Sequence, residues 1–361
     1  MDLSLTEEQR MIVDIVRRYV REQVAPLEDK LDPDAEELPP EDFARLTALT
    51  KDMGLYGLDT PPEYGGPEIG LVTRTLIALE ATQHRAGLYA PCYSTFGGAR
   101  QAQLFEASEE QKQRYLYPML RGEKKVFFGL SEPSGGSDPG RAIQTRAVRD
   151  GDEWVLNGSK LWISGADRAD YGLLFARTGG PGRTGVTCFI VETAWEGFKV
   201  ARIVHTLRSS KYATEIHLDN LRVPHENILG QEGGGFAIAN DRLSRQRIPY
   251  AAECVGVATR AHELAIEYSQ IRETFGAPLS TRQGIQWMLV ESEVDIRAMR
   301  WLVLDAAAKA DRGESFRTES AIAKLQCAEL SFKVVDRSMQ IHGGLGVAKD
   351  LPFERWFREM R

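Results

Sequence analysis

A short segment near the middle of the chain gathers hydroxyl groups, glycines and one carboxylate. It runs Leu130-Ser131-Glu132-Pro133-Ser134-Gly135-Gly136-Ser137-Asp138, and Leu161-Trp162-Ile163-Ser164 follows further on. Glycines let backbone N–H groups approach a ligand without Cβ obstruction, and serine side chains add donors. Trp162 offers an aromatic face, and Ser164, two positions later, is expected on the same side of a strand. The pattern favours a site for a flat heterocycle with many acceptors, such as a flavin; an ordinary Gly/Ser turn beside a core tryptophan is the alternative.

A second glycine-rich segment suggests a different cofactor. Gly180-Pro181-Gly182-Arg183-Thr184-Gly185 matches G-x-G-x-x-G and follows a predicted strand. A dinucleotide fingerprint must open a helix, whereas residues 186–191 have the composition of another strand. We therefore predict a hairpin loop here.

Composition and charge exclude several classes of partner. The 361 residues are 42% hydrophobic and carry a net charge of −7, with acids and bases interleaved. No basic block of the kind that follows a nucleic-acid backbone occurs, and no long apolar run predicts a membrane span. Four scattered cysteines predict reduced, mostly buried thiols in the cytoplasm, and neither they nor the six histidines have metal-ligand spacing. A soluble protein without a metal is expected.

Residues 1–125 are predicted to form an N-terminal helical domain. Thr6 and Gln9 have capping-box spacing, and apolar residues then recur at helical intervals until Pro26 is expected to end the helix. Further helical patterns cover residues 43–53, 72–80 and 109–120, with a turn at 61–66.

Residues 126–229 are predicted to form an inserted β domain. Strand-like segments cover 145–149, 154–156, 161–163, 173–177, 186–192 and 215–218, with turns at Asp150-Gly151 and Asn157-Gly158. Helical periodicity returns over 236–271, 282–311 and 319–341, so residues 230–361 are predicted to form a C-terminal helix bundle. The expected fold is mainly α with one β domain.

Two further motifs lie in the C-terminal region. Arg272-Glu273-Thr274-Phe275-Gly276 follows one predicted helix, and Gln340-Ile341-His342-Gly343-Gly344-Leu345-Gly346 ends another, continuing into Asp350-Leu351-Pro352-Phe353-Glu354-Arg355 and Arg358. With the loop at 130–138, in this order around a β domain, they closely resemble the acyl-CoA dehydrogenase family over essentially the whole chain. The resemblance implies a helical domain, a β-barrel or sandwich domain and a four-helix bundle, usually assembled as a homotetramer, a dimer of dimers.

The resemblance also implies FAD, held between the β domain and the C-terminal helices. Positions that match the lining of the isoalloxazine ring, with Ser164 near N5, are Phe128, Leu130, Ser131, Ser137, Trp162 and Ser164. Positions that match contacts to the FAD of a neighbouring subunit are Arg272, Thr274, Phe275, Gln340, Gly343 and Gly344, and Gln283 is a further implied cofactor contact. The residue types agree, because an arginine can neutralise a pyrophosphate and paired glycines let backbone approach it.

The implied reaction belongs to fatty acid metabolism. The family removes the α-proton of an acyl-CoA thioester while the β-hydrogen leaves as hydride to flavin N5, giving a trans-2-enoyl-CoA, and electrons pass to an electron-transfer flavoprotein. The implied substrate contacts are Ser137, Thr178, Ser244 and Arg247. Arg247 also matches an arginine found near the family's base, although a solvated helix arginine is the alternative.

The catalytic base departs from the family pattern. In most members a glutamate follows the Glu-Arg-x-x-Arg run, a position that here lies beyond Arg361. A minority carry it on the first bundle helix, where this chain has Gln246, an amide that cannot hold a proton near neutral pH. We expect the base beyond Arg361. The alternatives are a flavin-dependent acyl-CoA desulfinase, oxidase or reductase without that base, and a non-catalytic DNA-associated relative, which the acidic balance argues against.

Two other side chains are weighed as bases. His84 precedes residues 90–94, near the family's acyl pocket, but a structural role is favoured. Glu132, inside the glycine-rich loop, is expected to cap backbone groups instead.

Overall fold

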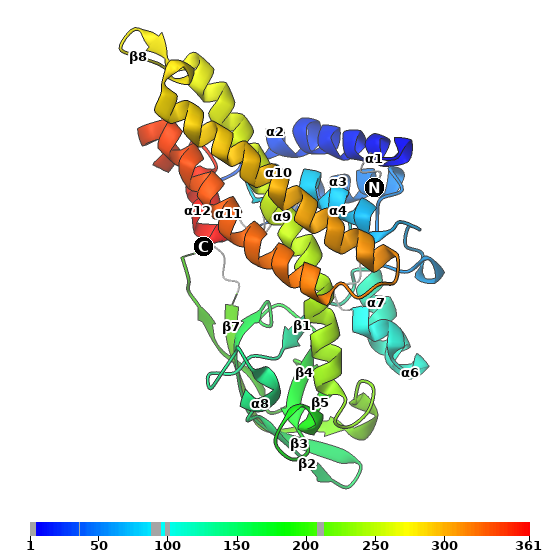
Figure 1. The fold of residues 1–361 in the computed structure, drawn as a ribbon. Coiled ribbons are helices and arrows are strands. Elements are labelled where there is room, and N and C mark those ends of the chain that lie inside the picture. The colour runs from blue at the N-terminus through cyan, green and yellow to red at the C-terminus, as the bar shows by residue number, and fades with distance from the viewer. Residues whose placement is uncertain (1–4, 36, 88–94, 98–101, 208–212) are drawn as a thin grey trace. The chain divides into compact units, whose positions relative to one another are not determined.

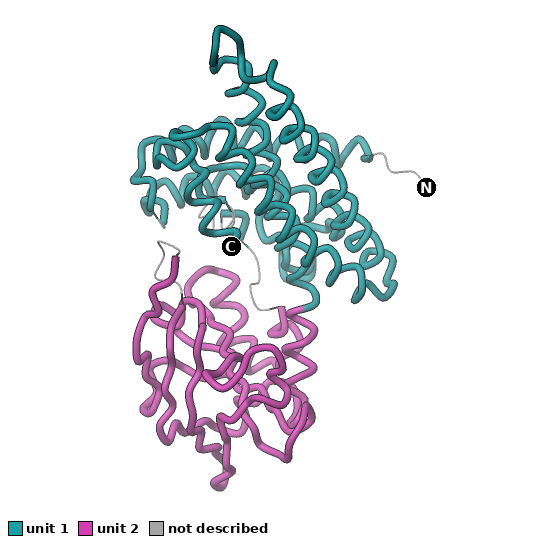
Figure 2. The backbone as a smooth tube through the Cα atoms, turned by 60° about the vertical axis from the view of Figure 1, so that its left-hand side comes forward, with its two compact units in different colours: residues 1–98, 244–361 teal, residues 99–243 magenta. Residues whose placement is uncertain are grey.

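The computed structural model describes residues 5–35, 37–87, 95–97, 102–207 and 213–361 (Figure 1). It contains two compact units, one of residues 1–98 and 244–361 and the other of residues 99–243 (Figure 2). The first is helical and the second contains the main β-sheet. The predicted mainly α fold with an inserted β domain is confirmed. The domain boundaries at 125/126 and 229/230 stay predictions.

The first helix begins as predicted and continues further than predicted. In α1 (Glu7–Arg18), the Thr6 hydroxyl accepts from the Gln9 N–H at 3.1 Å and the Gln9 side chain accepts from the Thr6 N–H at 3.1 Å. The expected stop at Pro26 is wrong, because a π-helical turn (Tyr19–Val24) leads directly into α2 (Ala25–Glu28). Near Pro26, which lacks an N–H, the Ala25 N–H bonds to the Val20 carbonyl, a spacing of five that keeps the helix hydrogen-bonded.

The remaining N-terminal helices lie where apolar periodicity placed them. α3 (Pro40–Asp52) and α4 (Leu71–Ala81) belong to the helical unit, while α6 (Glu109–Gln111), a π turn (Lys112–Leu116) and α7 (Tyr117–Leu120) belong to the other. A core cluster joins Val16 and Val20 to Leu46 of α3 and Ile77 of α4. The periodicity of apolar residues was sufficient to predict these helices, because each of them buries one apolar face.

Three long helices close the chain, as predicted. They are α9 (Gly235–Ile271), whose first residues, up to Leu243, belong to the β unit, α10 (Gln283–Asp311) and α11 (Arg317–His342); α12 (Phe353–Met360) follows. A short hairpin, β8 (Glu273–Thr274) and β9 (Ala277–Pro278), connects α9 to α10. In the core, alanines of α9 such as Ala258 share one cluster with Met299, Val334 and Trp356. Small side chains on α9 allow this close packing of helices.

The β unit is built on one seven-stranded sheet. Its order is β1 (Val126–Gly129), β4 (Tyr171–Arg177), β2 (Arg146–Asp150), β3 (Glu153–Ser164), β7 (Ala213–Pro224) and β6 (Phe198–Val204), and β5 (Val186–Glu192) pairs with β4. The G-x-G-x-x-G segment connects the antiparallel strands β4 and β5, so the predicted hairpin loop is confirmed. The short strand β1, parallel to β4, and the strand β6 were not predicted.

The predicted turn at Asn157-Gly158 is wrong, because β3 runs through both residues with only a local register shift. Asn157 instead accepts a hydrogen bond at 2.8 Å from the Asn220 N–H of β7. A Cβ on Gly158 would lie 2.6 Å from the Thr145 hydroxyl, so this glycine permits close approach of two segments.

Candidate functional site

The loop that follows β1 is anchored at its start by apolar contacts. The Phe128 ring packs on the Phe175 ring with centroids 4.9 Å apart, and the Arg242 guanidinium lies 4.2 Å from the Phe128 centroid. Leu130 is only 5% exposed. The predicted contacts Phe128 and Leu130 are therefore packed within the β unit, whereas Ser134, Gly136 and Ser137 of the same loop are exposed.

The two serines of this loop present hydroxyl groups that no other described side chain or backbone group engages. Ser131 is half-buried, and its carbonyl accepts a hydrogen bond at 3.0 Å from the Leu161 N–H of β3. Ser137 is exposed. Their hydroxyls are available as donors to a ligand, as the sequence predicts.

Trp162 has a strained backbone and an exposed ring. Its φ is +64°, it lies where the pairing of β3 with β7 shifts register, and it is 56% exposed. A tryptophan in the left-handed region is uncommon, and such strain persists where the surrounding structure imposes it. Because the strand is bulged here, the two-residue spacing to Ser164 does not by itself place both side chains on one face; both are nevertheless exposed.

Beneath this surface lies a fully buried ion pair. The Lys160 Nζ of β3 is 2.7 Å from Glu132 Oε1, and the Glu132 carboxylate also accepts from the N–H groups of Gln144, at 2.6 Å, and Thr145, at 3.1 Å. Burial opposes ionisation of Glu132, but Lys160 and these donors together lower the pKa of its carboxyl. The predicted backbone-capping role of Glu132 is confirmed, and its low pKa argues against a general base.

The sequence reasoning missed Lys160, although a signal was present. In β3 the buried residues Trp154 and Leu156 alternate with more exposed ones, and Lys160 follows at the same two-residue period. A lysine on the buried face of a strand requires acceptors inside the protein. The pattern could therefore have predicted a buried cation beside the loop.

In the helical unit, the predicted residues of the α9–α10 connection point outward. Phe275 is 100% exposed with φ +50°, and Arg272 is exposed, with no side-chain hydrogen bond or ion pair to another described residue. Thr274 is half-buried, and its carbonyl accepts a hydrogen bond from the Arg282 guanidinium. Gln283, the first residue of α10, is exposed. This connection thus presents an aromatic ring and a guanidinium that is not paired with any described residue.

The end of α11 carries the second predicted group of this unit. Gln340 is exposed on the last turn, and Gly343 follows the helix with φ +59°, a conformation that favours glycine. A Cβ added to Gly343 or Gly344 would meet nothing within 4 Å. Packing within the chain therefore does not explain Gly344, whereas close approach of a ligand to the backbone would.

The predicted substrate contacts lie on two elements. Thr178, just after β4, shares a 2.8 Å hydrogen bond with the Thr187 hydroxyl, which also accepts from the Gly233 N–H at 2.8 Å. On α9, Ser244 and Arg247 are half-buried and Gln246 is exposed. Arg247 makes no ion pair with the part of the chain that the structure describes, so its charge is available to a ligand.

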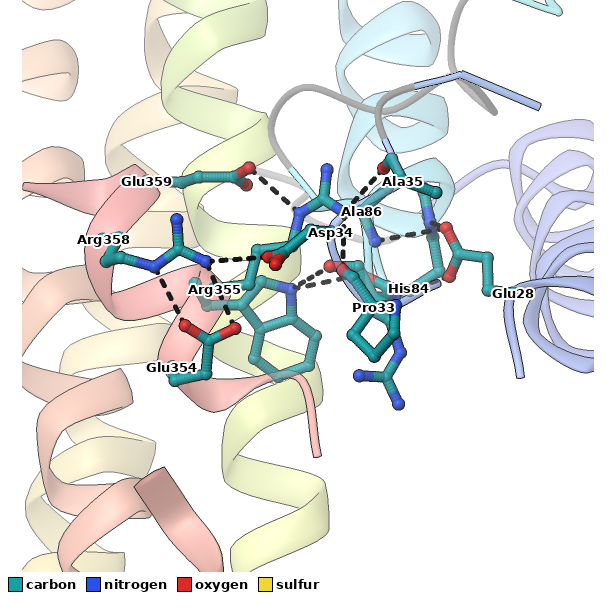
Figure 3. Close-up of polar contacts among 12 residues, drawn as sticks. Glu28, Pro33, Asp34, Ala35, His84, Ala86, Glu354, Arg355, Arg358 and Glu359 are labelled. Carbon is teal, nitrogen blue, oxygen red and sulfur yellow. Dashed lines mark hydrogen bonds and ion pairs between the residues drawn. The ribbon is translucent and has the colours of Figure 1, made fainter. Parts of the chain in front are cut away.

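His84 belongs to a structural cluster of the helical unit (Figure 3). Its fully buried ring places Nδ1 2.7 Å from Glu28 Oε1, and the other oxygen of Glu28 accepts from the Arg85 N–H at 2.8 Å. The Trp356 indole of α12 donates to the carbonyl of Arg85 at 3.0 Å. These contacts favour the structural role of His84 over a role as base. Residues 90–94, the acyl-pocket segment of the sequence analysis, lie outside the described residues.

The described residues do not form a metal site or a membrane-spanning helix. No group of three or more His, Cys, Asp or Glu side chains among them is arranged to hold a metal ion. Likewise, none of the helices that the structure describes is long and apolar enough to cross a membrane.

Each unit, taken by itself, presents side chains of the types that FAD requires. An exposed tryptophan beside serine hydroxyls suits a flat ring with many acceptors. An unpaired arginine and exposed glycine backbone suit a pyrophosphate. The residues present therefore fit this cofactor.

Comparison with known proteins identifies the same family over the whole chain. Family models described as the N-terminal, middle and C-terminal domains of acyl-CoA dehydrogenase match residues 6–123, 127–221 and 233–361. The short-chain specific acyl-CoA dehydrogenase of Clostridium acetobutylicum is 36% identical, over 100% of this chain and 94% of the relative. The acryloyl-CoA reductase (NADH) of Anaerotignum propionicum is 35% identical, over 100% of this chain and 91% of the relative.

A solved structure agrees. It is described as the electron transferring flavoprotein of Acidaminococcus fermentans, and it matches with a TM-score of 0.87 and 33% identity, over 100% of this chain and 94% of that chain.

Proposed function

This chain belongs to the acyl-CoA dehydrogenase family, and we propose that it desaturates a short acyl-CoA thioester between its α and β carbons. It is an FAD-dependent oxidoreductase acting on CH–CH bonds. The bound FAD supplies the hydride acceptor, and the product is the trans-2-enoyl-CoA. The short chain length is supported by the short-chain specific relative.

The observation that carries the cofactor site is Trp162. Trp162 has a backbone φ of +64° and an exposed indole ring. Both features are explained if the bulge of β3 turns the indole toward a planar ligand. Ser164 follows two residues later in β3, and the carbonyl of Ser131 bonds to the N–H of Leu161. Neither serine hydroxyl is hydrogen-bonded to another described residue, so both can donate to the ring's acceptors. We assign these residues, with Phe128, Leu130 and Ser137, to the isoalloxazine side of the site.

We assign the residues of the helical unit to the FAD of a neighbouring subunit. Phe275 is too exposed to contribute to its own chain's core, and Arg272 has no partner among the residues described. An exposed apolar face on α10 supports assembly, since Trp287, Val290 and Val294 recur at helical spacing and are 61%, 62% and 61% exposed. The cofactor residues proposed to act across the oligomer are Arg272, Thr274, Phe275, Gln283, Gln340, Gly343 and Gly344.

For the substrate, we propose contacts from Ser137, Thr178, Ser244 and Arg247. The side-chain donors of Ser137 and Arg247 are not hydrogen-bonded within the described part of the chain, and Arg247 would stabilise negative charge beside the base. Gln246 of α9 is not that base, because an amide does not accept and hold a proton near neutral pH.

We propose an electron-transfer flavoprotein as the acceptor of the electrons, and a cytoplasmic location. The first is supported by the likeness to a structure described as an electron transferring flavoprotein. The second is supported by three free, buried cysteines, Cys188, Cys254 and Cys327.

A second candidate is the reverse reaction, reduction of a 2-enoyl-CoA. The likeness to the acryloyl-CoA reductase of Anaerotignum propionicum favours it. The hairpin geometry of residues 180–185 argues against a nicotinamide site in that segment, because only a three-residue 3-10 helix (Arg183–Gly185) opens there before β5, and not an α-helix that could bind a pyrophosphate.

The purified protein tests both candidates. Reverse-phase analysis of the released cofactor is expected to give FAD, and FMN or no flavin would contradict the proposal. Anaerobic mixing with butyryl-CoA, octanoyl-CoA and crotonyl-CoA then separates substrates. Flavin reduction by butyryl-CoA supports the dehydrogenase, whereas oxidation of the reduced flavin by crotonyl-CoA without any forward reaction supports the reductase.

A further inference from the structure

We infer that the buried Lys160–Glu132 pair positions the flavin-binding loop against β3, so that Lys160 and Glu132 are positioning residues for FAD. This inference rests on the proposed flavin contacts of Ser131 and Trp162. Neither charged residue touches the surface that those side chains share, since Lys160 is 0% exposed and Glu132 is 5% exposed.

The Lys160 ammonium has as many hydrogen-bond acceptors around it as it has N–H donors. Its Nζ lies 2.7 Å from Glu132 Oε1, 3.3 Å from the Leu130 carbonyl and 2.5 Å from the Phe175 carbonyl. An ammonium has three N–H donors and here meets three acceptors, one of them charged. Burial lowers the pKa of Lys160 to about 8, against the attraction of Glu132, so the group remains mostly protonated at neutral pH.

Glu132 extends the connection to a further segment. Its carboxylate accepts from the N–H groups of Gln144 and Thr145, just before β2. The pair therefore joins the loop after β1, the segment before β2, β3 and β4 through one buried cluster. If any of these four segments moved, a buried charge or hydrogen-bond donor would lose its partner, which is strongly unfavourable.

The two residues of the pair are close in sequence to the proposed flavin contacts. Lys160 precedes Trp162 by two positions, and the Leu130 carbonyl that it binds adjoins Ser131. The Leu161 N–H also bonds to the Ser131 carbonyl at 3.0 Å. The ammonium and this backbone bond thus set the position of Ser131 relative to Trp162.

Stability alone does not explain the pair. A well-packed apolar pair of similar volume commonly stabilises a fold as much as a buried ion pair does, because desolvation of two charges offsets their attraction. An apolar pair cannot, however, bind the Leu130 and Phe175 carbonyls at fixed points. The charged pair supplies hydrogen bonds of defined direction, which a cofactor site needs.

The pair also balances charge near the cofactor. Lys160→Met removes the cation that lowers the pKa of Glu132, so at alkaline pH an unpaired buried carboxylate would remain beside the proposed flavin contacts. This charge disfavours the anionic reduced flavin, so the reduction potential should fall there. Glu132→Gln removes the attraction that keeps Lys160 protonated and lowers the pKa of Lys160 further, so the remaining ammonium should raise the potential only at acidic pH. A lost structural contact would not produce two shifts of opposite sign.

The test compares Lys160→Met, Glu132→Gln and the double variant with wild type. FAD affinity is measured by titrating apoprotein, and the Tm by thermal denaturation. The flavin potential is measured by reduction against a reference dye at acidic and at alkaline pH. We expect each single variant to bind FAD at least about tenfold more weakly, since displacement of a site by about 1 Å is known to cost up to 10²-fold in function. The double variant should recover the wild-type potential but not the affinity.

Arg222→Gln is the matched control. Arg222 of β7 pairs on the surface with Glu153 at the other end of β3, at 2.8 Å, and both side chains are exposed. This variant should leave FAD affinity and potential unchanged. Variants of Lys160 and Glu132 that lower only the Tm, with affinity and potential as in wild type, would overturn the inference.

Two further variants keep the outcome decisive. If Lys160→Met does not fold, Lys160→Arg retains the charge but spreads its donors over a planar fork that cannot reach the same three acceptors from one point. Unchanged affinity and potential in Lys160→Arg would then refute the inference. Trp162→Ala separates the two proposals. If it leaves FAD affinity unchanged, the flavin site itself is misplaced; if it weakens binding and the Lys160 variants do not, only the positioning role fails.

Discussion

The two sets of proposed flavin contacts differ in how much their own chain supports them. In the β unit, Leu130 is 5% exposed and the Ser131 carbonyl is bonded to β3. In the helical unit, Phe275 is 100% exposed, and the Arg272 side chain makes no hydrogen bond or ion pair with the residues described. A side chain that its own fold does not hold becomes ordered only against something else. The contrast supports a site in which one chain supplies a fixed wall and another supplies the groups that close it.

Neither set contains the base, so a change at Gln246 should have the largest effect on catalysis. Gln246 is exposed on α9, at the position where a minority of the family carries the glutamate. We compare the protein of residues 1–361 with its Gln246→Glu variant. Butyryl-CoA should reduce the flavin of the variant about 10²–10⁴-fold faster, which is the usual contribution of a general base. Stopped-flow flavin absorbance measures this directly.

Gln246→Asn, which keeps the amide, is the control and should not accelerate the reaction. Fast flavin reduction by the protein without this substitution would show that another residue within positions 1–361 is the base. No reduction by any form would favour a reaction other than dehydrogenation.

Arg272→Ala tests the half of the site supplied by the helical unit. Loss of a hydrogen-bonded cation opposite a phosphate costs about 1.5–3 kcal/mol, or about 10–150-fold in affinity. Since FAD bound across subunits stabilises the assembly by mass action, flavin content and oligomeric state should fall together. Analytical ultracentrifugation with absorbance detection follows both. Arg312→Ala, which removes an exposed ion pair with Glu314 after α10, should change neither.

A result would contradict this arrangement if Arg272→Ala lost flavin but stayed assembled at every dilution. The contribution of Arg272 would then be made within its own subunit.

Trp162→Ala tests the wall that the β unit provides. Removal of an aromatic contact of this size costs about 1–3 kcal/mol, so FAD should bind about 5–150-fold more weakly while the oligomer stays intact. Titration of apoprotein with FAD gives the affinity. Val148→Ala, a 62% exposed residue on β2, is the control for the same sheet. If Trp162→Ala lost its flavin and also dissociated into subunits, the flavin contacts of the β unit would not differ in role from those of the helical unit.

The same contrast explains how much of the site the sequence could predict. Helices and the hairpin after β4 followed from periodicity and turn composition, because these signals are local. The turn at Asn157-Gly158 failed because its glycine serves a close approach to Thr145, a contact distant in sequence. The predicted end of the first helix at Pro26 was wrong because a π turn rearranges the backbone hydrogen bonds around this proline. Lys160 was missed because its three acceptors come from a loop and another strand, which only the folded sheet brings together.

The smallest expected effect concerns the buried carboxylate of the helical unit, which lies among no proposed flavin contacts. Burial opposes ionisation of Glu28, but His84 and the N–H groups of Ala86 and Arg85 together hold the pKa of Glu28 below its usual value of 4.5. A carboxyl group with a lowered folded-state pKa stabilises the fold above pH 4.5, and this contribution is lost as the pH falls through the folded-state value. The wild-type Tm should therefore decrease on acidification below about pH 4.5. Glu28→Gln, which keeps one acceptor but no charge, should lose about 1–3 kcal/mol at neutral pH and show a flatter pH dependence.

Circular dichroism melts between pH 3 and pH 7 measure both quantities, and Glu41→Gln, an exposed carboxylate on α3, is the control. The flavin spectrum of Glu28→Gln should match wild type, in contrast to the variants of the Glu132–Lys160 pair. Both clusters bury a carboxylate against a basic side chain and backbone N–H groups, but only the cluster of the β unit adjoins proposed cofactor contacts in sequence. The contrary result is that Glu28→Gln changes the flavin affinity as much as Glu132→Gln does. In that case the loss of any buried carboxylate would weaken cofactor binding, and the position of Glu132 in the loop at 130–138 would not matter.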